Sequence, residues 1–411
     1  MPLTVCPKKS PRRSASLRLP LTALVAALSV AHPFMGCQGV SAQERGPAAI
    51  PLDQLRQAVN KLGDLDYATR MTAGRTIRRA QPAQAVTVLL QAVNDHADGF
   101  IRFRALVLLT GFNDPRTLDA MDDAVVSPND RLREVAYGYF EQHPDPRMID
   151  KMLIALDQET GEFVRPALVR ALAALGKDAR VSEALIRDAG RGLDFFRSTV
   201  IEALGDYRIA PAVPKLIEIA KVEGPLQDDA ATALGKIGDQ RALATLAEMQ
   251  QKAPQEIQPA IAAAICLLGA NCPSHVGYLE KSLKYAESIP GYQDLLRGAA
   301  AGLGAISTKG NAGTLTTLFD VGIPSQDPVR APVTLALGLV ALRNTPLMLK
   351  TLEARPDQDQ ALGILAEAFD MLEEDLEEER FFVAVRRAYW AAPDASPTRK
   401  LCEALINKLD F

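Results

Sequence analysis

Two cysteines lie six residues apart in the second half of this chain, Cys266 and Cys272, and their thiols are its first candidates for chemistry. Thiols this close could form a disulfide in an oxidising compartment, or one could act as a nucleophile if its pKa were low. The structural alternative makes Cys266, in the apolar run IAAAICLL, a small buried side chain and Cys272 a free thiol in a turn. These interpretations stay open. A third cysteine, Cys402, is predicted to be a buried single thiol.

Other catalytic patterns do not occur in the sequence. His96, His143 and His275 each stand alone, and we predict solvated turns for the first two rather than metal ligation. There is no Gly-x-Ser-x-Gly elbow and no Ser-x-x-Lys pair. The glycine-rich stretch 298–310 does not fit a phosphate loop, because Lys309 is followed by glycine instead of serine or threonine. We therefore predict no catalytic residue, no cofactor and no metal ion.

A repeated phrase, Ala-Leu-Gly, defines the elements around these residues. It ends at Gly176, Gly205, Gly235 and Gly338, and the first three glycines fall 29 and 30 residues apart. A helix pair of that length cannot bury its own apolar face and must stack on its neighbours. We predict an all-α solenoid of about ten stacked helix pairs, at about 67–93, 99–125, 129–156, 161–189, 193–220, 225–250, 255–283, 292–320, 327–353 and 358–390.

A second repeated feature, Asp-x-Arg, is predicted to begin the second helix of a pair. The aspartate suits the N-cap, because its carboxylate can accept hydrogen bonds from the free amides of the first turn. Gly235, with Gly238, is predicted to end the first helix as a C-cap. Stacked repeats would line the triplets into a ladder. Their charged residues are Asp114 and Arg116, Asp145 and Arg147, Asp178 and Arg180, and Asp239 and Arg241.

These features resemble the HEAT-repeat class, in the short variety first associated with phycobilisome lyases. The matching residues are an Arg or Gln eight positions before the glycine (Arg197, Gln227 and Arg330), the Ala-Leu-Gly itself, and the Asp-x-Arg. The resemblance implies an α-solenoid over about 67–390. It leaves function open, since such proteins include bilin lyases, hydroxylases and scaffolds. The paired His-Glu iron motifs of the hydroxylases are missing from this sequence.

The first 42 residues have the composition of an export signal. A basic stretch precedes the apolar run 19–31, which is too short to span a bilayer, and Val40-Ser41-Ala42 favours cleavage before Gln43. Gly36-Cys37 supports an alternative, a lipoprotein signal in which Cys37 is lipidated. We expect an exported protein, either periplasmic or secreted, or an outer-membrane lipoprotein. A membrane contact is expected only with the lipid anchor at Cys37.

Charge excludes nucleic acid as the main partner. Without the five basic residues of the signal, 41 Lys and Arg stand against 50 Asp and Glu, a net charge of −9. Arginines crowd the first repeats, and acidic residues crowd Glu373 to Glu379. We interpret both as solvated faces and contacts between repeats, with a polarised binding face as the alternative. Aromatic pairs are interpreted as core and cap residues: Phe195-Phe196, Phe381-Phe382 and Tyr389-Trp390.

The predicted organisation is a cleaved signal (1–42), a tether and cap helix (43–66), the solenoid (67–390) and a C-terminal cap helix (391–411). We expect a curved stack of eleven layers of packed helices that forms a rod of roughly 90 to 110 Å. Its predicted function is that of a non-enzymatic scaffold of the bacterial cell envelope, gripping a protein partner on a concave face of successive second helices. The alternative is an enzyme or maturation factor of the bilin-lyase-like class, with a divergent pocket near Cys266 and Cys272.

Overall fold

The computed structural model describes residues 46–288, 291–372 and 375–411. The predicted export signal, Cys37, Gln43 and the acidic residues Glu373 and Glu374 lie outside these ranges. Within them the chain forms 22 α-helices, four short 3-10 turns and one isolated β-bridge, between Ala48 and Ala80. The predicted all-α solenoid is confirmed.

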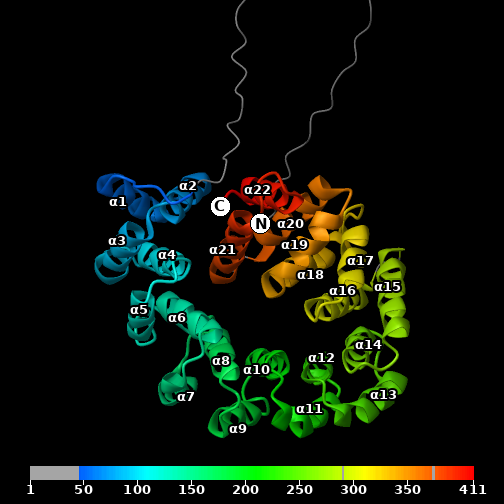
Figure 1. Cartoon of the computed structure of the whole chain (residues 1–411). Coiled ribbons are helices and arrows are strands. Elements are labelled where there is room, and N and C mark those ends of the chain that lie inside the picture. Colours follow the sequence, from blue (N-terminus) through cyan, green and yellow to red (C-terminus); the bar gives the residue numbers. More distant parts are fainter. Residues whose placement is uncertain (1–45, 289–290, 373–374) are drawn as a thin grey trace, which may run out of the picture. The chain divides into compact units, whose positions relative to one another are not determined.

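Two layers of helices alternate along the chain (Figure 1). After the leading helix α1 (Leu52–Asn60), the inner layer consists of α2 (Tyr67–Arg78), α4 (Gly99–Thr110), α6 (Asp130–Gln142), α8 (Val164–Ala174), α10 (Asp194–Asp206), α12 (Gln227–Ile237), α14 (Gln258–Leu267), α16 (Gln293–Thr308), α18 (Arg330–Arg343) and α20 (Gln358–Leu372). The outer layer consists of α3 (Pro82–Asp95), α5 (Arg116–Ala124), α7 (Ile149–Gln158), α9 (Ala179–Asp188), α11 (Val213–Ala220), α13 (Leu243–Lys252), α15 (Cys272–Ser288), α17 (Ala312–Gly322) and α19 (Thr345–Ala354). The chain ends with α21 (Asp375–Ala391) and α22 (Pro397–Leu409).

The Arg or Gln that precedes three of the four Ala-Leu-Gly phrases has a capping role. Its side chain reaches back to the carbonyl groups that end the preceding outer helix, which have no partner inside that helix. These three pairs are therefore tied to the ones before them by a hydrogen bond from side chain to backbone. The donors and acceptors are Arg197 to Ala189 (3.1 Å), Gln227 to Ala220 (3.0 Å) and Arg330 to Gly322 (2.9 Å).

The glycine of Ala-Leu-Gly acts in helix packing, so the predicted C-cap role of Gly235 is wrong. Gly235 lies inside α12, and a Cβ atom there would overlap the backbone of Ala264 in α14. At Gly205 the added Cβ would lie 2.7 Å from the Cα of Ala233. Gly238 is the C-cap, with a left-handed φ of 82° that glycine adopts without strain. The missing side chain lets successive inner helices touch backbone to backbone.

The Asp-x-Arg triplets form the expected N-caps but pair internally. Each aspartate accepts a hydrogen bond from the backbone N–H two residues later, at 2.9 or 3.0 Å. The guanidinium of the same triplet folds back onto that carboxylate, as in Arg241 with Asp239 (2.6 Å). Two of the four arginines also reach the repeat before them, Arg180 at Asp150 (2.7 Å) and Arg116 at Thr87 (3.4 Å). The triplets therefore cap single helices, and contacts from one repeat to the next occur at two of the four.

The stack is curved, as expected, but the expected rod is wrong, because the described helices close into a ring (Figure 1). Arg78 of α2 and Glu379 of α21 form a buried bidentate ion pair with donor–acceptor distances of 2.6 to 3.0 Å. Arg75 pairs with Asp410 at 2.6 Å, and Arg104 of α4 pairs with Asp375. We call these contacts of α21 and α22 with α2, α4 and α6 the seam.

The seam also corrects the interpretation of the charged segments. Glu379 is 2% exposed, so the part of the acidic run that the structure describes is not a solvated face. Burial lowers the pKa of Arg104, and the neighbouring Arg78 lowers it further. Arg78 and Arg104 lie close enough to repel each other, and an acidic residue beside them relieves this repulsion. Asp375 and Glu379, near the end of the chain, supply that negative charge. Arg102 and Arg133 do contact neighbouring parts of the stack, as expected.

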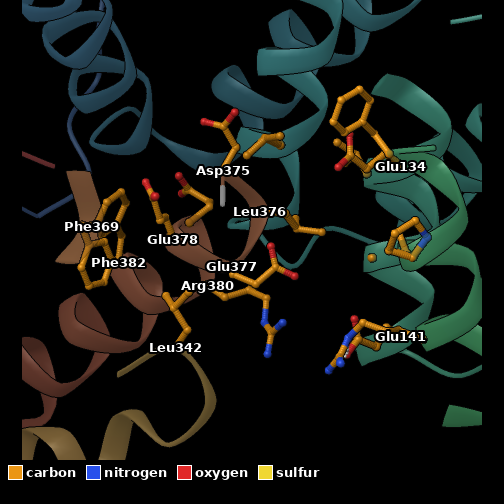
Figure 2. A pocket seen from close by; sticks show the side chains of 18 of the residues that line it. Glu134, Glu141, Leu342, Phe369, Asp375, Leu376, Glu377, Glu378, Arg380 and Phe382 are labelled. Atoms are coloured by element: carbon orange, nitrogen blue, oxygen red, sulfur yellow. Dashed lines mark hydrogen bonds and ion pairs between the residues drawn. The ribbon is translucent and has the colours of Figure 1, made fainter. Parts of the chain in front are cut away.

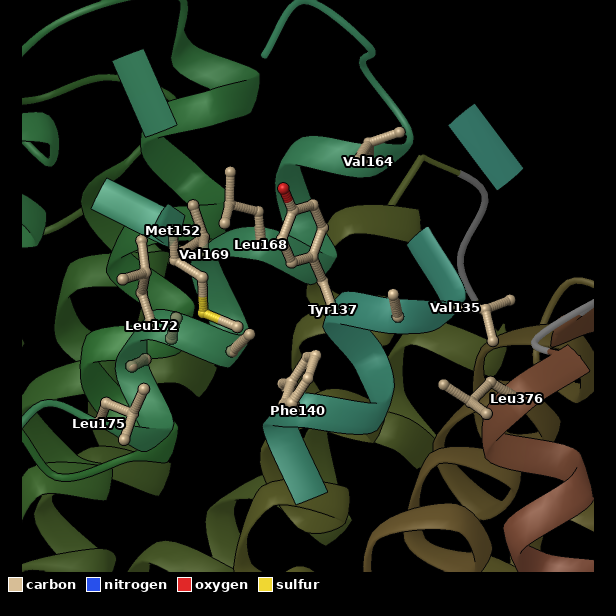
Figure 3. Close-up of a cluster of buried hydrophobic side chains, with 14 of the residues drawn as sticks. Val135, Tyr137, Phe140, Met152, Val164, Leu168, Val169, Leu172, Leu175 and Leu376 are labelled. Atoms are coloured by element: carbon tan, nitrogen blue, oxygen red, sulfur yellow. The ribbon is translucent and has the colours of Figure 1, made fainter. Parts of the chain in front are cut away.

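An apolar contact joins the seam to the core. Leu376 of α21 belongs to the hydrophobic core of the first half of the chain, and Figure 3 shows it beside Val135 of α6. A Cβ on Gly138 would overlap the Leu376 side chain, so this approach requires glycine. Leu376 of the last repeat pair is thus buried against α6, which lies more than 200 residues earlier in the chain.

Candidate protein-binding cavity

The ring encloses a cavity of about 1410 Å³. Its walls are α2, α4, α6, α8 and α10 on one side, and α18, α20, α21 and α22 on the other. Figure 2 shows Glu134 and Glu141 on one wall, with Glu377 and Arg380 on the wall across from them. Most of these helices are the first of their pairs, so the expected concave face of second helices is wrong. The physical reason is the glycine contact described above. It lets the first helices of successive pairs approach each other more closely than the second helices do, so the stack curves with the first helices on its inner side.

A cluster of charged residues fixes one end of the cavity, and we call it the charged hub: Glu141, Arg170, Glu202, Asp206, Lys236 and Arg343. Arg170 donates to Glu141 (2.9 Å) and to Asp206 (3.0 Å). Lys236 pairs with Asp206 at 2.8 Å. Arg343 of α18 donates to Glu202 of α10 at 2.9 Å, which ties together inner helices four repeats apart.

The electrostatics of the hub hold its carboxylates ionised. Burial by itself opposes ionisation of Asp206, but Lys236, Arg343 and Arg170 together bring the pKa of Asp206 below its ordinary value. The pKa of Glu202 is lowered in the same way, against burial, chiefly by Arg343. The hydroxyl of Tyr207 donates to Glu141 at 2.5 Å, and burial together with that carboxylate raises the pKa of the phenol. The hub is thus a mutually satisfied network.

Aromatic side chains follow the N-terminal ends of the inner helices along the other part of the cavity wall. We call Tyr67, Phe100, Phe163 and Phe195 the aromatic row; all four line the cavity. Phe163 is 79% exposed, Phe195 68% and Tyr67 61%. Phe100 is half-buried and lies against the guanidinium of Arg131, 5.5 Å from its ring centre. Exposed side chains of this size gathered on a concave wall are typical of interaction sites.

Sequence reasoning missed the aromatic row. Phe195 was expected in the core together with Phe196, but Phe196 is 6% exposed while Phe195 faces the cavity. Helical periodicity could have separated them, because Phe196 shares an apolar stripe with Val200 and Ala203, and Phe195 does not. Phe381, Phe382 and Tyr389 are buried, as expected, whereas Trp390 is 46% exposed.

The cysteines lie away from this cavity. Cys266 in α14 and Cys272 at the start of α15 form a disulfide, which closes the turn within one helix pair. Neither residue lines the cavity. Cys402 is buried in α22, where burial raises the pKa of its thiol to about 11. The expected alternative pocket near Cys266 and Cys272 therefore does not coincide with the main cavity of the described residues.

In the part of the chain that the structure describes, no three His, Cys, Asp or Glu side chains are grouped so that they could hold a metal ion. Over the same residues, no single helix is long and apolar enough to cross a membrane, and only the sharply bent pair α18 and α19 reaches that length and composition together.

A family model described as HEAT repeats matches residues 52–141. Residues 52–141 therefore match HEAT repeats. The matched segment begins at α1 and ends within α6, and the predicted repeat class is confirmed there. Beyond it the helix pairs continue, with Arg197, Gln227 and Arg330 as capping side chains. No curated protein matches the chain.

Solved structures are similar to parts of this solenoid. YibA of Escherichia coli is 17% identical, and the match covers 53% of this chain and 82% of YibA, with a TM-score of 0.39. The complex of CpcE and CpcF of phycocyanin lyase from Nostoc sp. PCC7120 is 20% identical over 54% of this chain and 89% of that one, with a TM-score of 0.33. A mutant of Kap121p is 14% identical, covers 87% of this chain and has a TM-score of 0.39. The match spans 45% of Kap121p.

Proposed function

We propose that this protein is a non-enzymatic scaffold that binds a segment of another protein in the cavity of its HEAT ring. The aromatic row carries the proposal. Phe163 and Phe195 are exposed rings on adjacent inner helices, and both face an enclosed space large enough for a peptide segment. Aromatic side chains contribute a large share of binding energy at protein interfaces because they bury much apolar area with few rotatable bonds.

The chemistry of the cavity supports a binding role over a catalytic one. Carboxylates and cations of the charged hub are engaged with one another, as in Arg170 with Glu141 and Lys236 with Asp206. General acid–base catalysis needs a group whose pKa lies near the working pH, but the pKa of Asp206 is held low and that of Tyr207 high. The free thiol of Cys402 is buried with a raised pKa, which disfavours a nucleophilic thiolate.

We further propose that the scaffold works in the bacterial cell envelope. The composition of residues 1–42 supports export, with either cleavage before Gln43 or lipidation at Cys37. The disulfide between Cys266 and Cys272 supports an oxidising compartment. Mass spectrometry of the protein from its native host tests this: an N-terminus at Gln43 or a lipidated Cys37 is expected, and an intact residue 1 would overturn it.

Site-specific photocrosslinking in the native host tests the binding role. A photoreactive phenylalanine analogue replaces Phe163 in the cavity, and the matched control places it at Ile154, which is 58% exposed on the outer helix α7. We expect one protein to be trapped in stoichiometric amounts from position 163 and not from position 154. Equal trapping at both positions, or none at position 163, would contradict the proposal.

A further inference from the structure

We propose that the cavity takes an extended protein segment that presents arginine or lysine side chains at about every third residue. The aromatic row and the carboxylates beside it would recognise those cations. This inference rests on the proposed scaffold function and names the chemistry of its partner.

The spacing of the row matches an extended chain. Phe163 and Phe195 occupy the N-terminal ends of adjacent inner helices, α8 and α10. Neighbouring helices lie about 8 to 10 Å apart. An extended peptide advances about 3.3 to 3.6 Å per residue. Side chains about three residues apart on a bound segment therefore reach successive inner helices, and a segment of about a dozen residues covers the five helices from Tyr67 to Phe195.

Guanidinium groups already stack on aromatic rings in this wall. Arg131 lies 5.5 Å from the ring centre of Phe100. Outside the cavity lining, Arg165 lies 3.6 Å from the ring centre of the buried Phe196. Arg70 lies 5.5 Å from the ring centre of Tyr67. Phe163 and Phe195 have no ring or cation contact with any described residue. The face of an exposed aromatic ring attracts cations, and a carboxylate next to the ring strengthens that attraction. A cation is therefore the ligand that best suits these rings.

Charge complementarity points to a basic segment. The exposed carboxylate of Glu162 stands next to Phe163 and lines the cavity. Asp194 beside Phe195 is also exposed, but it lies outside the lining and pairs with Arg197 at 3.0 Å. The residues that line the cavity include 12 Asp and Glu against 9 Lys and Arg. Four of the nine cations that line the cavity are paired with carboxylates: Arg78, Arg104, Arg170 and Arg343. An acidic segment would have to displace these partners, whereas a basic one meets the excess of negative charge.

Peptide binding to the purified full-length protein tests the inference. The probe is a fluorescein-labelled peptide of four Arg-Gly-Ser repeats, measured by fluorescence anisotropy at low and at high salt. A peptide of four Glu-Gly-Ser repeats is the charge control, and a peptide of the same composition with its four arginines contiguous is the spacing control. We expect the Arg-Gly-Ser peptide to bind most tightly, and its Kd to rise with salt because exposed ion pairs are screened.

Variants locate the site. Phe163→Ala and Phe195→Ala should each raise the Kd by about two- to fivefold, the factor expected of one cation–π contact. Phe163→Trp should restore or tighten binding, because tryptophan offers the strongest ring face. The matched control is Val222→Ala, a 65% exposed apolar residue that does not line the cavity, and its Kd should stay unchanged. Both phenylalanines are exposed, and unchanged circular dichroism melting will show that the variants fold.

Several results would overturn the inference. These are equal binding of the Glu-Gly-Ser peptide, equal binding of the contiguous-arginine peptide, or a Kd unaffected by both phenylalanine variants. Failure here is distinguishable from failure of the scaffold function. A partner trapped at position 163 through a segment without Lys or Arg would refute the basic-segment inference and leave the scaffold intact. The absence of any trapped partner would refute the scaffold itself.

Discussion

Neighbouring inner helices meet through glycine and alanine, whereas the first and last helices meet through arginine and carboxylate side chains. At Gly205 and Gly235 the contact partner is the backbone of the next inner helix, and the interface is dry and local. At the seam, Arg78 and Glu379 are buried as ions, and the Nη1 atom of Arg78 has no hydrogen-bond partner among the described residues. Burying ions costs desolvation energy that an incomplete network recovers only in part. The seam is therefore the interface at which this ring can open with least loss of folded structure.

The largest expected effect comes from breaking the buried pair of the seam. Arg78→Met should leave Glu379 buried without its cation and destabilise the seam by about 3 to 5 kcal/mol. Hydrogen exchange should then accelerate in α21 and α22, and not in α12. The double variant Arg78→Met with Glu379→Leu should recover most of the loss, because apolar replacement of a buried pair is often neutral or stabilising. Equal exchange in the single and double variants would show that the pair does not hold the seam.

A slightly smaller effect is expected at the interface between repeats. Gly235→Val forces a side chain into the backbone of Ala264 and should lower the free energy of unfolding by about 1 to 3 kcal/mol, measured by urea denaturation. Its exchange should accelerate in α12 and α14 and leave the seam protected. Gly277→Ala is the matched control in α15, since a Cβ there meets nothing within 4 Å. A loss at Gly277→Ala as large as at Gly235→Val would contradict the packing role.

Acid should weaken the charged hub. The pKa values of Asp206 and Glu202 are below those of the unfolded chain, so their stabilisation is present above the unfolded pKa near 4 and is lost as pH falls below it. One salt-bridged carboxylate contributes on the order of 2 kcal/mol. Urea midpoints measured from pH 7 down to pH 3 should therefore fall, and Asp206→Asn should be less stable at pH 7 and less sensitive to acid. Parallel pH curves for the two proteins would argue against the hub.

The smallest effect is expected at a single cap. Asp239→Ala removes the acceptor of the Arg241 backbone N–H and should cost about 1 kcal/mol, the typical value of an N-cap. Asp123→Ala, an exposed residue near the end of α5 without a capping bond, should change stability by less than about 0.5 kcal/mol. Identical thermal melting of the two variants would show that the triplet is not a working cap.

Features that depend on residues close together in the chain could be predicted from the sequence, whereas contacts between distant helices could not. The helix pairs could be predicted from their apolar spacing, and some also carry a capping aspartate such as Asp178 or a closing glycine such as Gly238 within a few residues. The role of Gly235 was misassigned because a helix glycine near a turn looks like a cap until its neighbour in the next pair is known. Phe195 of the aromatic row was missed because it was grouped with Phe196, although the apolar stripe of α10 contains Phe196 and not Phe195.

The sequence by itself determined the helices, their caps and their stacking order, because these follow from interactions between residues close together in the chain. Only the tertiary structure decided that Arg78 meets Glu379, that the first helices face inward and that Phe163 and Phe195 share one wall. Those outcomes depend on the small rotation between successive repeats, summed over ten pairs. The rotation depends on how closely each glycine lets two helices approach. The total rotation over all the pairs cannot be predicted from any local pattern in the sequence.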